Sequence, residues 1–347
     1  MNSKATENLM PQRQLGIFER LLLRLVKLIH HLLVRYARTK TTATRPSYCK
    51  IYPSHPTLEH RVFLPPNENG NAGPTKKKLP LMIDIHGGGF ILGEPSVDDP
   101  FCRWMADDCS MIVVSINYRK APKFKFPTAH EDCVAAAIAI LNDPDLVIDH
   151  ENVFIGGQSA GGNLALSTSR NEKLRGKFKG LVIWYPLIDM AIPIKTRADF
   201  RGDPNVSSTM RRTWEHFQTI NVPAGVDLAN PILSPFYASP AEFPKASFFL
   251  CGSDDMLTYD TLMMADKLAG NATKIHNSTE LVELWRAGDV VWAQAHGHPH
   301  AFNEMPLRNK KDEGRRQAIL KDLYGRIKLW MDEQIAAPAQ HGESDAK

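Results

Sequence analysis

The segment Gly157-Gln158-Ser159-Ala160-Gly161 decides the fold of this chain of 347 residues, because it joins two structural elements through a very short turn. The apolar run Val-Phe-Ile at 153–155 precedes the segment, and the helix-like sequence Asn-Leu-Ala-Leu at 163–166 follows it. A strand, a sharp turn and a helix in this order form a nucleophile elbow, whose small flanking residues avoid clashes in strained backbone. The pattern therefore predicts that the hydroxyl group of Ser159 projects above a sheet, at the positive end of a helix that favours negative charge.

A glycine-rich loop upstream provides backbone N–H groups that can form an oxyanion hole. The sequence His-Gly-Gly-Gly-Phe at 86–90 directly follows an apolar strand predicted at 79–85. Alone, a GxSxG pattern is weak, and a glycine run can be a flexible turn. The two motifs occur together in the order that one mechanism demands, so we expect Ser159 to be a nucleophile. The backbone N–H groups of Gly88, Gly89 and Ala160 are then the expected oxyanion hole, and His86 is expected to fix the glycine loop.

An acid and a histidine must follow the serine along the chain to complete a catalytic triad. A buried strand is predicted at 248–252, and Asp254 and Asp255 follow it at the carboxyl edge of the sheet, where catalytic groups collect. Three histidines, at positions 296, 298 and 300, lie in one later segment. Their alternation with Gly and Pro, without an acidic ligand partner of metalloprotease type, argues against a metal site.

Further motifs accompany these residues and together are highly specific: YRKAP at 118–122, FPTAHED at 126–132, YPLID at 185–189 and Ser-Pro at 234–235. With them, the chain from about Tyr52 to its last helix resembles the hormone-sensitive-lipase family of α/β-hydrolases, the fold-3 carboxylesterases that include proteins similar to arylacetamide deacetylase. In that family the acid is followed by one residue and then Leu, and the base precedes a small residue and then Phe. The resemblance thus implies that Asp255 is the acid and His300 the base.

The same resemblance assigns lesser roles to the neighbouring candidates. Asp254 is expected to serve a turn or a helix cap, and His296 and His298 are expected to be loop residues near the mouth of the pocket. The aspartates at 132 and 189, within the family's motifs, are interpreted as structural.

Two features depart from the family's pattern. Gln158 precedes the serine where the family usually has Asp or Thr, so the hydrogen bonds that steady the elbow are expected to differ. A longer and more charged segment at 277–289 separates the acid from the histidine, and we interpret it as a surface insertion.

The expected fold class is α/β, an α/β-hydrolase fold with a mostly parallel central sheet, helices on both faces and a helical cap. The catalytic domain is expected at 46–336, with a cap insertion at about 191–231 that contains a helix at 208–220, and a disordered tail at 337–347. Strands are predicted at 61–64, 79–85, 111–117, 153–155, 181–185, 247–251 and 290–295. Helices of this domain are predicted at 98–108, 129–142, 160–169, 259–268 and 311–336.

Residues 1–45 form a separate segment. Within it, residues 15–36 place apolar side chains at helical spacing, with Arg, Lys and His largely between them. Charges interrupt every long apolar run, which argues against a membrane span. Two interpretations remain: the helix packs onto the enzyme as part of the cap, or it lies on a membrane surface. A homodimer contact is also open.

Composition fits a single globular enzyme domain, since 43% of the residues are hydrophobic and 23% are charged. The formal net charge of +4 is mild and does not predict a nucleic-acid partner. The five scattered cysteines form no disulfide framework and no CxxC pair, which indicates reduced thiols. No cleavable signal-peptide pattern is evident, so we expect an intracellular protein, cytoplasmic or peripherally associated with an endomembrane.

The expected function is serine carboxylic-ester hydrolysis through an acyl-enzyme, on a small-molecule ester, lactone or acyl substrate, with no metal or cofactor. A lyase or cyclase could use the same pocket, although the intact oxyanion loop favours hydrolysis. A non-catalytic receptor similar to the gibberellin receptors, which also carry an N-terminal helical lid, is disfavoured. Those receptors lack the catalytic histidine that is expected here at position 300. The cap shapes the pocket, so the fold alone does not give the substrate.

Overall fold

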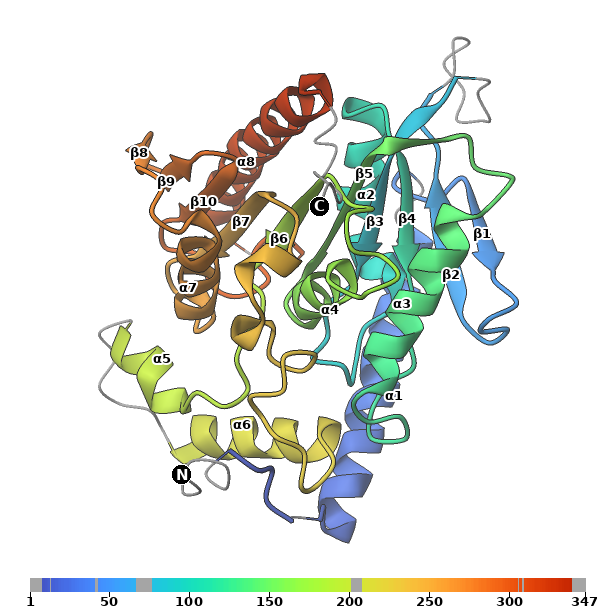
Figure 1. Cartoon of the computed structure of the whole chain (residues 1–347). Helices are drawn as coiled ribbons and strands as arrows, with labels where there is room; N and C mark the ends of the chain where they lie inside the picture. The colour runs from blue at the N-terminus through green and yellow to red at the C-terminus, as the bar shows by residue number, and fades with distance from the viewer. Residues whose placement is uncertain are drawn as a thin grey trace, which may run out of the picture.

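The computed structural model describes residues 8–12, 14–40, 43–66, 77–200, 208–304, 306–307 and 309–338. Within these ranges the chain forms a ten-stranded sheet of order β1-β2-β4-β3-β5-β6-β7-β10-β9-β8 (Figure 1). The strands are β1 (Tyr48–Ile51), β2 (Glu59–Phe63), β3 (Leu79–Ile85), β4 (Ile112–Ile116), β5 (Ile148–Gln158), β6 (Gly180–Trp184), β7 (Ala246–Gly252), β8 (Ile275–His276), β9 (Val282–Ala287) and β10 (Val290–Ala295). The central strands from β4 to β10 run parallel, and the strands at both edges pair antiparallel.

Helices cover both faces of this sheet (Figure 1). On one face α2 and α8 meet through the stacked rings of Trp104 and Tyr324, whose centroids lie 4.4 Å apart. On the other face lie α3, α4 and α7. The helices of the described chain are α1 (Ile17–Lys40), α2 (Asp99–Asp108), α3 (Thr128–Leu141), α4 (Ala160–Ser169), α5 (Ile194–Phe200), α6 (Ser208–Asn221), α7 (Thr258–Ala269) and α8 (Lys310–Ala336).

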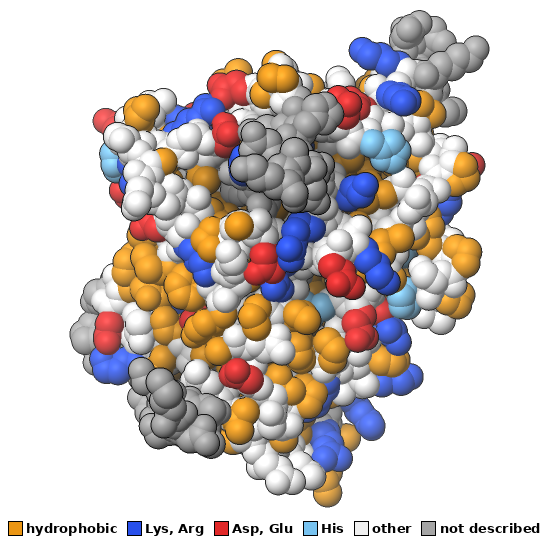
Figure 2. Space-filling model, in the orientation of Figure 1, with side chains coloured by type: hydrophobic (Ala, Val, Ile, Leu, Met, Phe, Trp, Pro, Cys, Tyr) orange, Lys and Arg blue, Asp and Glu red, His pale blue; other side chains and the backbone are white. Residues whose placement is uncertain are grey.

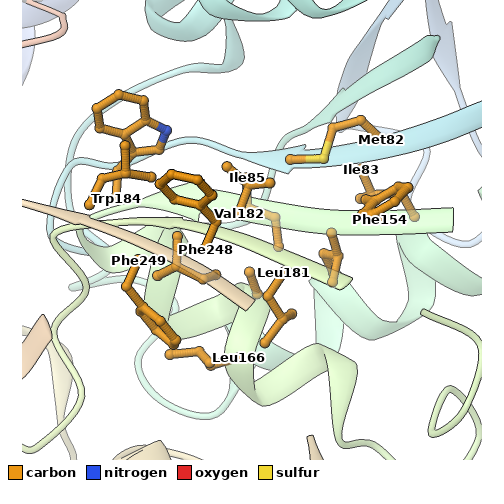
Figure 3. Packing of buried hydrophobic residues seen from close by; sticks show 14 of the residues in the cluster. Met82, Ile83, Ile85, Phe154, Leu166, Leu181, Val182, Trp184, Phe248 and Phe249 are labelled. Carbon is orange, nitrogen blue, oxygen red and sulfur yellow. The ribbon is translucent and has the colours of Figure 1, made fainter. Parts of the chain in front are cut away.

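The core lies on both sides of the parallel strands, which explains why these strands are almost continuously apolar. Every residue of β6 and β7 is buried. Figure 3 shows Phe248 and Phe249 of β7 among the apolar side chains of the neighbouring strands and of Leu166 in α4. Burial contributes about 1.5–3 kcal/mol for each large apolar side chain, so the strand ends that carry the site are held firmly.

The predicted fold class is confirmed, and the strands predicted at 79–85 and 290–295 coincide with β3 and β10. The interpretation of residues 277–289 as a surface insertion is wrong for β9, which continues the sheet as an antiparallel partner of β10. Trp285 of β9 is buried and its ring stacks on that of Trp292 in β10. The apolar residues of β9 are interrupted by Glu283 and Arg286 and do not alternate regularly, so the sequence shows no clear strand pattern here.

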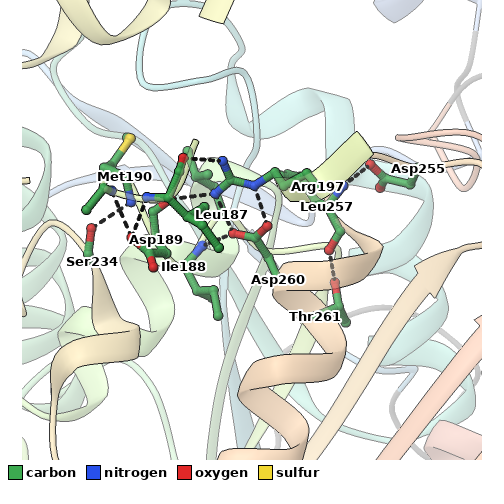
Figure 4. A network of polar contacts seen from close by, with 12 residues as sticks. Leu187, Ile188, Asp189, Met190, Arg197, Ser234, Asp255, Leu257, Asp260 and Thr261 are labelled. Carbon is green, nitrogen blue, oxygen red and sulfur yellow. Dashed lines mark hydrogen bonds and ion pairs between the residues drawn. The ribbon is translucent and has the colours of Figure 1, made fainter. Parts of the chain in front are cut away.

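The segment expected to form a cap contains α5 and α6, which lie together with α1 at one end of the molecule (Figure 1). Arg197 of α5 is fully buried, and its Nε lies 2.5 Å from Oδ2 of Asp260 in α7 (Figure 4). The chain before α1 joins the same layer, because Met10 exchanges backbone hydrogen bonds with Gly225 and Val226. The tail predicted at 337–347 lies outside the described residues from 339 onward.

The helix predicted at 15–36 is present as α1, but it contacts the enzyme through its polar side. Oε1 of Glu19 lies 2.5 Å from Nε2 of His216 in α6, and Nζ of Lys27 donates a hydrogen bond to the carbonyl oxygen of Ala121. Ile17 and Phe18 are 81% and 77% exposed, and the remaining apolar stripe is also exposed at Leu21, Leu22, Leu25, Leu28, Ile29 and Leu32. Of the two interpretations left open, the exposed side chains of these residues contradict the one in which the stripe packs onto the enzyme as part of the cap.

The orientation of α1 follows from helical geometry. Glu19 and Lys27 are eight residues apart and lie on one side of the helix, about opposite the apolar stripe. Figure 2 shows Lys and Arg side chains beside hydrophobic ones where α1 lies, at the lower right of the molecule. None of the helices among the described residues combines the length and the apolar character that crossing a membrane requires.

Candidate active site

Ser159 lies at the tip of the sharp turn between β5 and α4. Its backbone angles, φ 55° and ψ −116°, belong to a region that residues with side chains rarely adopt. A Cβ atom on Gly161 would lie 1.8 Å from the carbonyl oxygen of Ile85, and one on Gly157 would lie 2.5 Å from the same oxygen. The predicted need for small residues around the serine is thus confirmed, because β3 passes too close for any side chain.

Ser159, His300 and Asp255 come together from three distant parts of the chain. Nε2 of His300 lies 3.0 Å from Oγ of Ser159, and Nδ1 of the same ring lies 2.7 Å from Oδ2 of Asp255. The other carboxylate oxygen of Asp255 accepts the N–H group of Leu257 at 2.8 Å (Figure 4). Because Asp255 is buried and held at both oxygens, its carboxylate directs the imidazole toward the serine.

The neighbouring aspartate and histidines lie elsewhere. Asp254 is exposed and accepts a hydrogen bond from the hydroxyl group of Ser253 at 2.9 Å. His298 is buried, its Nδ1 lies 2.9 Å from the carbonyl oxygen of His296, and its ring packs against Phe302. His298 is thus a loop residue, as expected, but its ring is folded into the protein.

The surroundings of His300 favour its protonated form. Burial by itself lowers the pKa of this histidine, but the hydrogen bond and the charge of Asp255, together with the charge of Glu304, outweigh burial and raise the pKa. Burial also raises the pKa of Glu304 to about 7, against the hydrogen bond from Tyr185 and the charge of His300, which lower it. A developing imidazolium is thus stabilised at this position.

The glycine loop adopts the backbone that an oxyanion hole requires. Gly88 and Gly89 have φ values of 109° and 63°, and a Cβ atom on Gly88 would lie 2.3 Å from the carbonyl oxygen of Leu92. Within the described chain, no carbonyl oxygen accepts a hydrogen bond from the N–H groups of Gly88 or Gly89. Ala160 is the first residue of α4, and its N–H group has no acceptor one turn earlier. These donors are available to an anion.

His86 supports the glycine loop through contacts with Gly87 and Tyr118, as predicted. Its ring stacks on that of Tyr118 with centroids 4.4 Å apart, and its Nδ1 lies 2.7 Å from the carbonyl oxygen of Gly87. The hydroxyl group of Tyr118 lies 3.1 Å from the carbonyl oxygen of His86 and 3.2 Å from that of Gly87, so either oxygen can accept its proton. Asp132 is buried and bonded to Arg119, which fits its interpretation as structural.

Aromatic side chains of α6 cover the glycine loop, which the sequence did not indicate. A Cβ atom on Gly89 would lie 2.8 Å from Cε2 of Phe217, so this ring rests directly on the loop. The rings of Trp214 and Phe217 stack with centroids 5.5 Å apart. Their spacing of three residues on a predicted helix was the available signal, but it did not reveal which neighbour they contact.

Sequence reasoning also missed the polar groups around His300. The hydroxyl group of Tyr185, in the YPLID motif, contacts Gln158, Asn303 and Glu304. No local pattern marks Asn303 or Glu304. Among the residues that the structure describes, no group of three or more His, Cys, Asp or Glu side chains is arranged to hold a metal ion.

Comparison with known proteins identifies the family. Residues 82–283, more than half of the chain, match the family described as alpha/beta hydrolase fold. The chain therefore belongs to the α/β-hydrolases, and its predicted resemblance to their hormone-sensitive-lipase branch is confirmed.

Individual relatives agree with this assignment. An arylesterase of Saccharolobus solfataricus is 30% identical over 283 residues, which cover 77% of this chain and 80% of the relative. A 2-hydroxyisoflavanone dehydratase of Glycyrrhiza echinata is 26% identical over 302 residues, which cover 80% of this chain and 82% of that protein. The solved structure of a thermostable carboxylesterase cloned from a metagenomic library is similar with a TM-score of 0.69 at 23% identity, covering 89% of this chain and 97% of that one. At that identity the structural likeness shows the fold alone.

Proposed function

We propose that this chain is a serine carboxylic-ester hydrolase that acts on a small-molecule ester, lactone or acyl substrate through an acyl-enzyme. The observation that carries the proposal is the simultaneous contact of His300 with Ser159 and Asp255. The amides of Gly88 and Gly89, which donate to no carbonyl oxygen of the described chain, complete the site. The arylesterase relative supports it.

The geometry assigns each group a step. Nε2 of His300 takes the proton of Ser159 as Oγ attacks the ester carbonyl carbon, and the amides of Gly88, Gly89 and Ala160 bind the resulting oxyanion. The imidazolium gives that proton to the departing alcohol, which leaves an acyl ester on the serine. Water then gives a proton to the histidine and attacks the acyl carbon, and collapse releases the acid and restores the serine.

Replacement of the serine tests this mechanism. Ser159→Ala should lower turnover of chromogenic acyl esters by several orders of magnitude and leave only the residual activity that the oxyanion hole supports. An organophosphate should label the wild-type enzyme at Ser159, with one adduct visible in the intact mass. A series of esters of increasing chain length would define the acyl preference. Near wild-type turnover in the Ser159→Ala variant would contradict the proposal.

The dehydratase relative favours elimination as a second candidate reaction. Elimination uses a base and an oxyanion site, but the base removes a proton from one substrate carbon while a hydroxyl group leaves the neighbouring carbon as water. A double bond forms between the two carbons, and no acyl group is left on Ser159. Mass analysis of the enzyme during turnover separates the two reactions. An acyl adduct on Ser159 supports hydrolysis, whereas a dehydrated product without any adduct supports elimination.

We also propose that α1 places the enzyme on the surface of an anionic intracellular membrane. Its exposed stripe from Ile17 to Leu32 would enter the interface, and the exposed Arg20 and Arg24 stand at the border of that stripe. Basic side chains beside an apolar helical face complement a negatively charged lipid surface. A second copy of the chain is the alternative occupant of the same stripe.

A further inference from the structure

A buried polar contact links the turn at Ser159 to the segment that follows His300. Oε1 of Gln158 accepts hydrogen bonds from the hydroxyl group of Tyr185 at 3.0 Å and from Nδ2 of Asn303 at 2.9 Å. Gln158 is fully buried at the end of β5, directly before the serine. The residue that departs from the family's pattern therefore connects the nucleophile turn with the histidine segment.

Tyr185 is placed to act on His300 directly. Its ring centroid lies 4.6 Å from that of His300, with the rings inclined by 60°. Tyr185 is fully buried, and its φ of 33° is strained for a residue with a side chain. Its N–H group donates to the carbonyl oxygen of Leu250 at 2.6 Å, which fixes the backbone at this strained position.

The hydroxyl group of Tyr185 has more acceptors than protons. It contacts Oδ1 of Asn303 and lies 3.1 Å from Oε1 of Glu304, in addition to its contact with Gln158. A phenol hydroxyl donates only one hydrogen bond, so the other contacts need donors on the partner side. When Glu304 is protonated, its carboxyl group can donate a hydrogen bond to the hydroxyl group of Tyr185. When Glu304 is ionised, the side-chain amides of Gln158 and Asn303 can turn so that a nitrogen donates to this hydroxyl group. The direction of hydrogen bonding at Tyr185 thus follows the protonation of Glu304.

Other elements hold this arrangement in place. Arg316 of α8 is buried and donates to the carbonyl oxygens of Phe302 and Asn303, so the histidine segment is fixed on both sides. The titratable groups that influence Glu304, or are influenced by it, come from several elements: Tyr185, His300, Asp84, Asp98, Tyr118 and Tyr324.

We propose that Gln158, Tyr185 and Glu304 are positioning residues, which hold His300 against Ser159 and transmit the charge of Glu304 to the imidazole. This inference rests on the proposed ester hydrolysis. It gives the unusual glutamine a role, since a neutral amide can accept from, or donate to, the shared hydroxyl as Glu304 changes its charge.

Removal of the shared hydroxyl is the first test. Tyr185→Phe keeps the ring against His300, and we expect kcat to fall about ten- to hundredfold, because a buried hydrogen bond to a charged group is lost, with KM little changed. Tyr237→Phe is the matched control, because the hydroxyl of Tyr237 also contacts a carboxylate, that of Asp189, at 3.1 Å. Rates are expressed per site titrated with organophosphate, so unfolded protein lowers the titre and not kcat.

The charge of Glu304 is tested by the pH dependence of kcat/KM, whose acidic limb reports the free enzyme. In the wild type, the negative charge of Glu304 raises the pKa of His300, and the charge of His300 lowers the pKa of Glu304. Glu304→Gln removes that charge, so the pKa of His300 should fall and the acidic limb should move to lower pH. A merely structural role would lower thermal stability and leave the limb in place.

A double variant shows whether the two residues act through one contact. If they do, Tyr185→Phe with Glu304→Gln should be no slower than the slower single variant, because both changes remove the same link. Multiplied effects, an unmoved acidic limb, or a kcat in Tyr185→Phe equal to that in Tyr237→Phe would each overturn the inference. These outcomes are distinct from failure of the proposed function, in which Ser159→Ala itself would retain turnover.

Discussion

The helices α4 and α1 differ in where their apolar side chains lie, which are buried in α4 and exposed along much of α1. Every residue of α4 is buried, and its first residues are small because β3 and the neighbouring strands pass close to them. In α1 the apolar side chains from Ile17 to Leu32 face outward, while Glu19 and Lys27 contact the enzyme. The contrast shows that an apolar pattern reveals a helix but not the surface that covers it.

Because of this difference, substitutions near α4 and substitutions in the apolar stripe of α1 should affect different properties of the enzyme. The surroundings of α4 fix the position of Ser159 to within the reach of His300, so changes there should alter turnover or folding. The side chains of the apolar stripe of α1 are exposed, and they take no part in the hydrogen bonds that join Ser159, His300 and Asp255. Changes in that stripe should alter what the enzyme adheres to and leave the chemistry intact.

The largest effect should come from the acid of the triad. Asp255→Asn keeps the shape of the side chain but favours the wrong tautomer of His300, and a loss on the order of ten-thousandfold in kcat is expected. Asp254→Asn is the matched control, because Asp254 is exposed and its carboxylate accepts a hydrogen bond from the hydroxyl group of the adjacent Ser253, so a change of no more than about twofold is expected. Equal losses in the two variants, with ester kinetics normalised to labelled sites, would mean that the triad acid is assigned incorrectly.

A smaller but clear effect should follow from filling the space at the turn. A methyl group at Gly161 would meet the carbonyl oxygen of Ile85 at 1.8 Å, so Gly161→Ala should destabilise the fold by at least about 3 kcal/mol or prevent folding. Gly314→Ala makes the same substitution in α8, where nothing lies within 4 Å of the added atom, and should stabilise the protein by about 0.5–1 kcal/mol. Denaturant unfolding of both variants checks the opposite signs. A tolerated alanine at 161 would contradict the close approach of β3.

The turn at Ser159 and the acid and base could be predicted, because their constraints are local or are carried by motifs. The sharp turn requires glycine at positions 157 and 161, where a Cβ atom would clash with the carbonyl oxygen of Ile85, and this requirement is visible in the local sequence. The choice of Asp255 over Asp254 needed the family's pattern, and the structure places Asp255 in contact with His300.

The link from Gln158 to Glu304 could not be predicted, because it depends on contacts between distant segments. Asn303 and Glu304 follow His300 without any periodic pattern, and their position depends on Arg316, which arrives from α8. The same reason applies to β9, whose pairing with β10 is hidden by charged residues. It applies again to α1, since the side of a helix that meets the protein is decided by polar partners such as His216.

The smallest effect on turnover, and a large effect on attachment, should follow from changing the apolar stripe of α1. Leu21→Ser with Leu25→Ser removes two exposed apolar side chains, which should weaken binding to anionic phospholipid vesicles and leave kcat and KM for a soluble ester unchanged. Leu329→Ser is the matched control, because Leu329 of α8 is 65% exposed outside this stripe. Binding by the wild type should weaken in salt, since Arg20 and Arg24 contribute attraction that is screened. Sedimentation with vesicles and light scattering without them are measured on the same samples. A concentration-dependent dimer that the double variant abolishes, without vesicle binding by the wild type, would assign the stripe to a second copy of the chain and exclude the membrane.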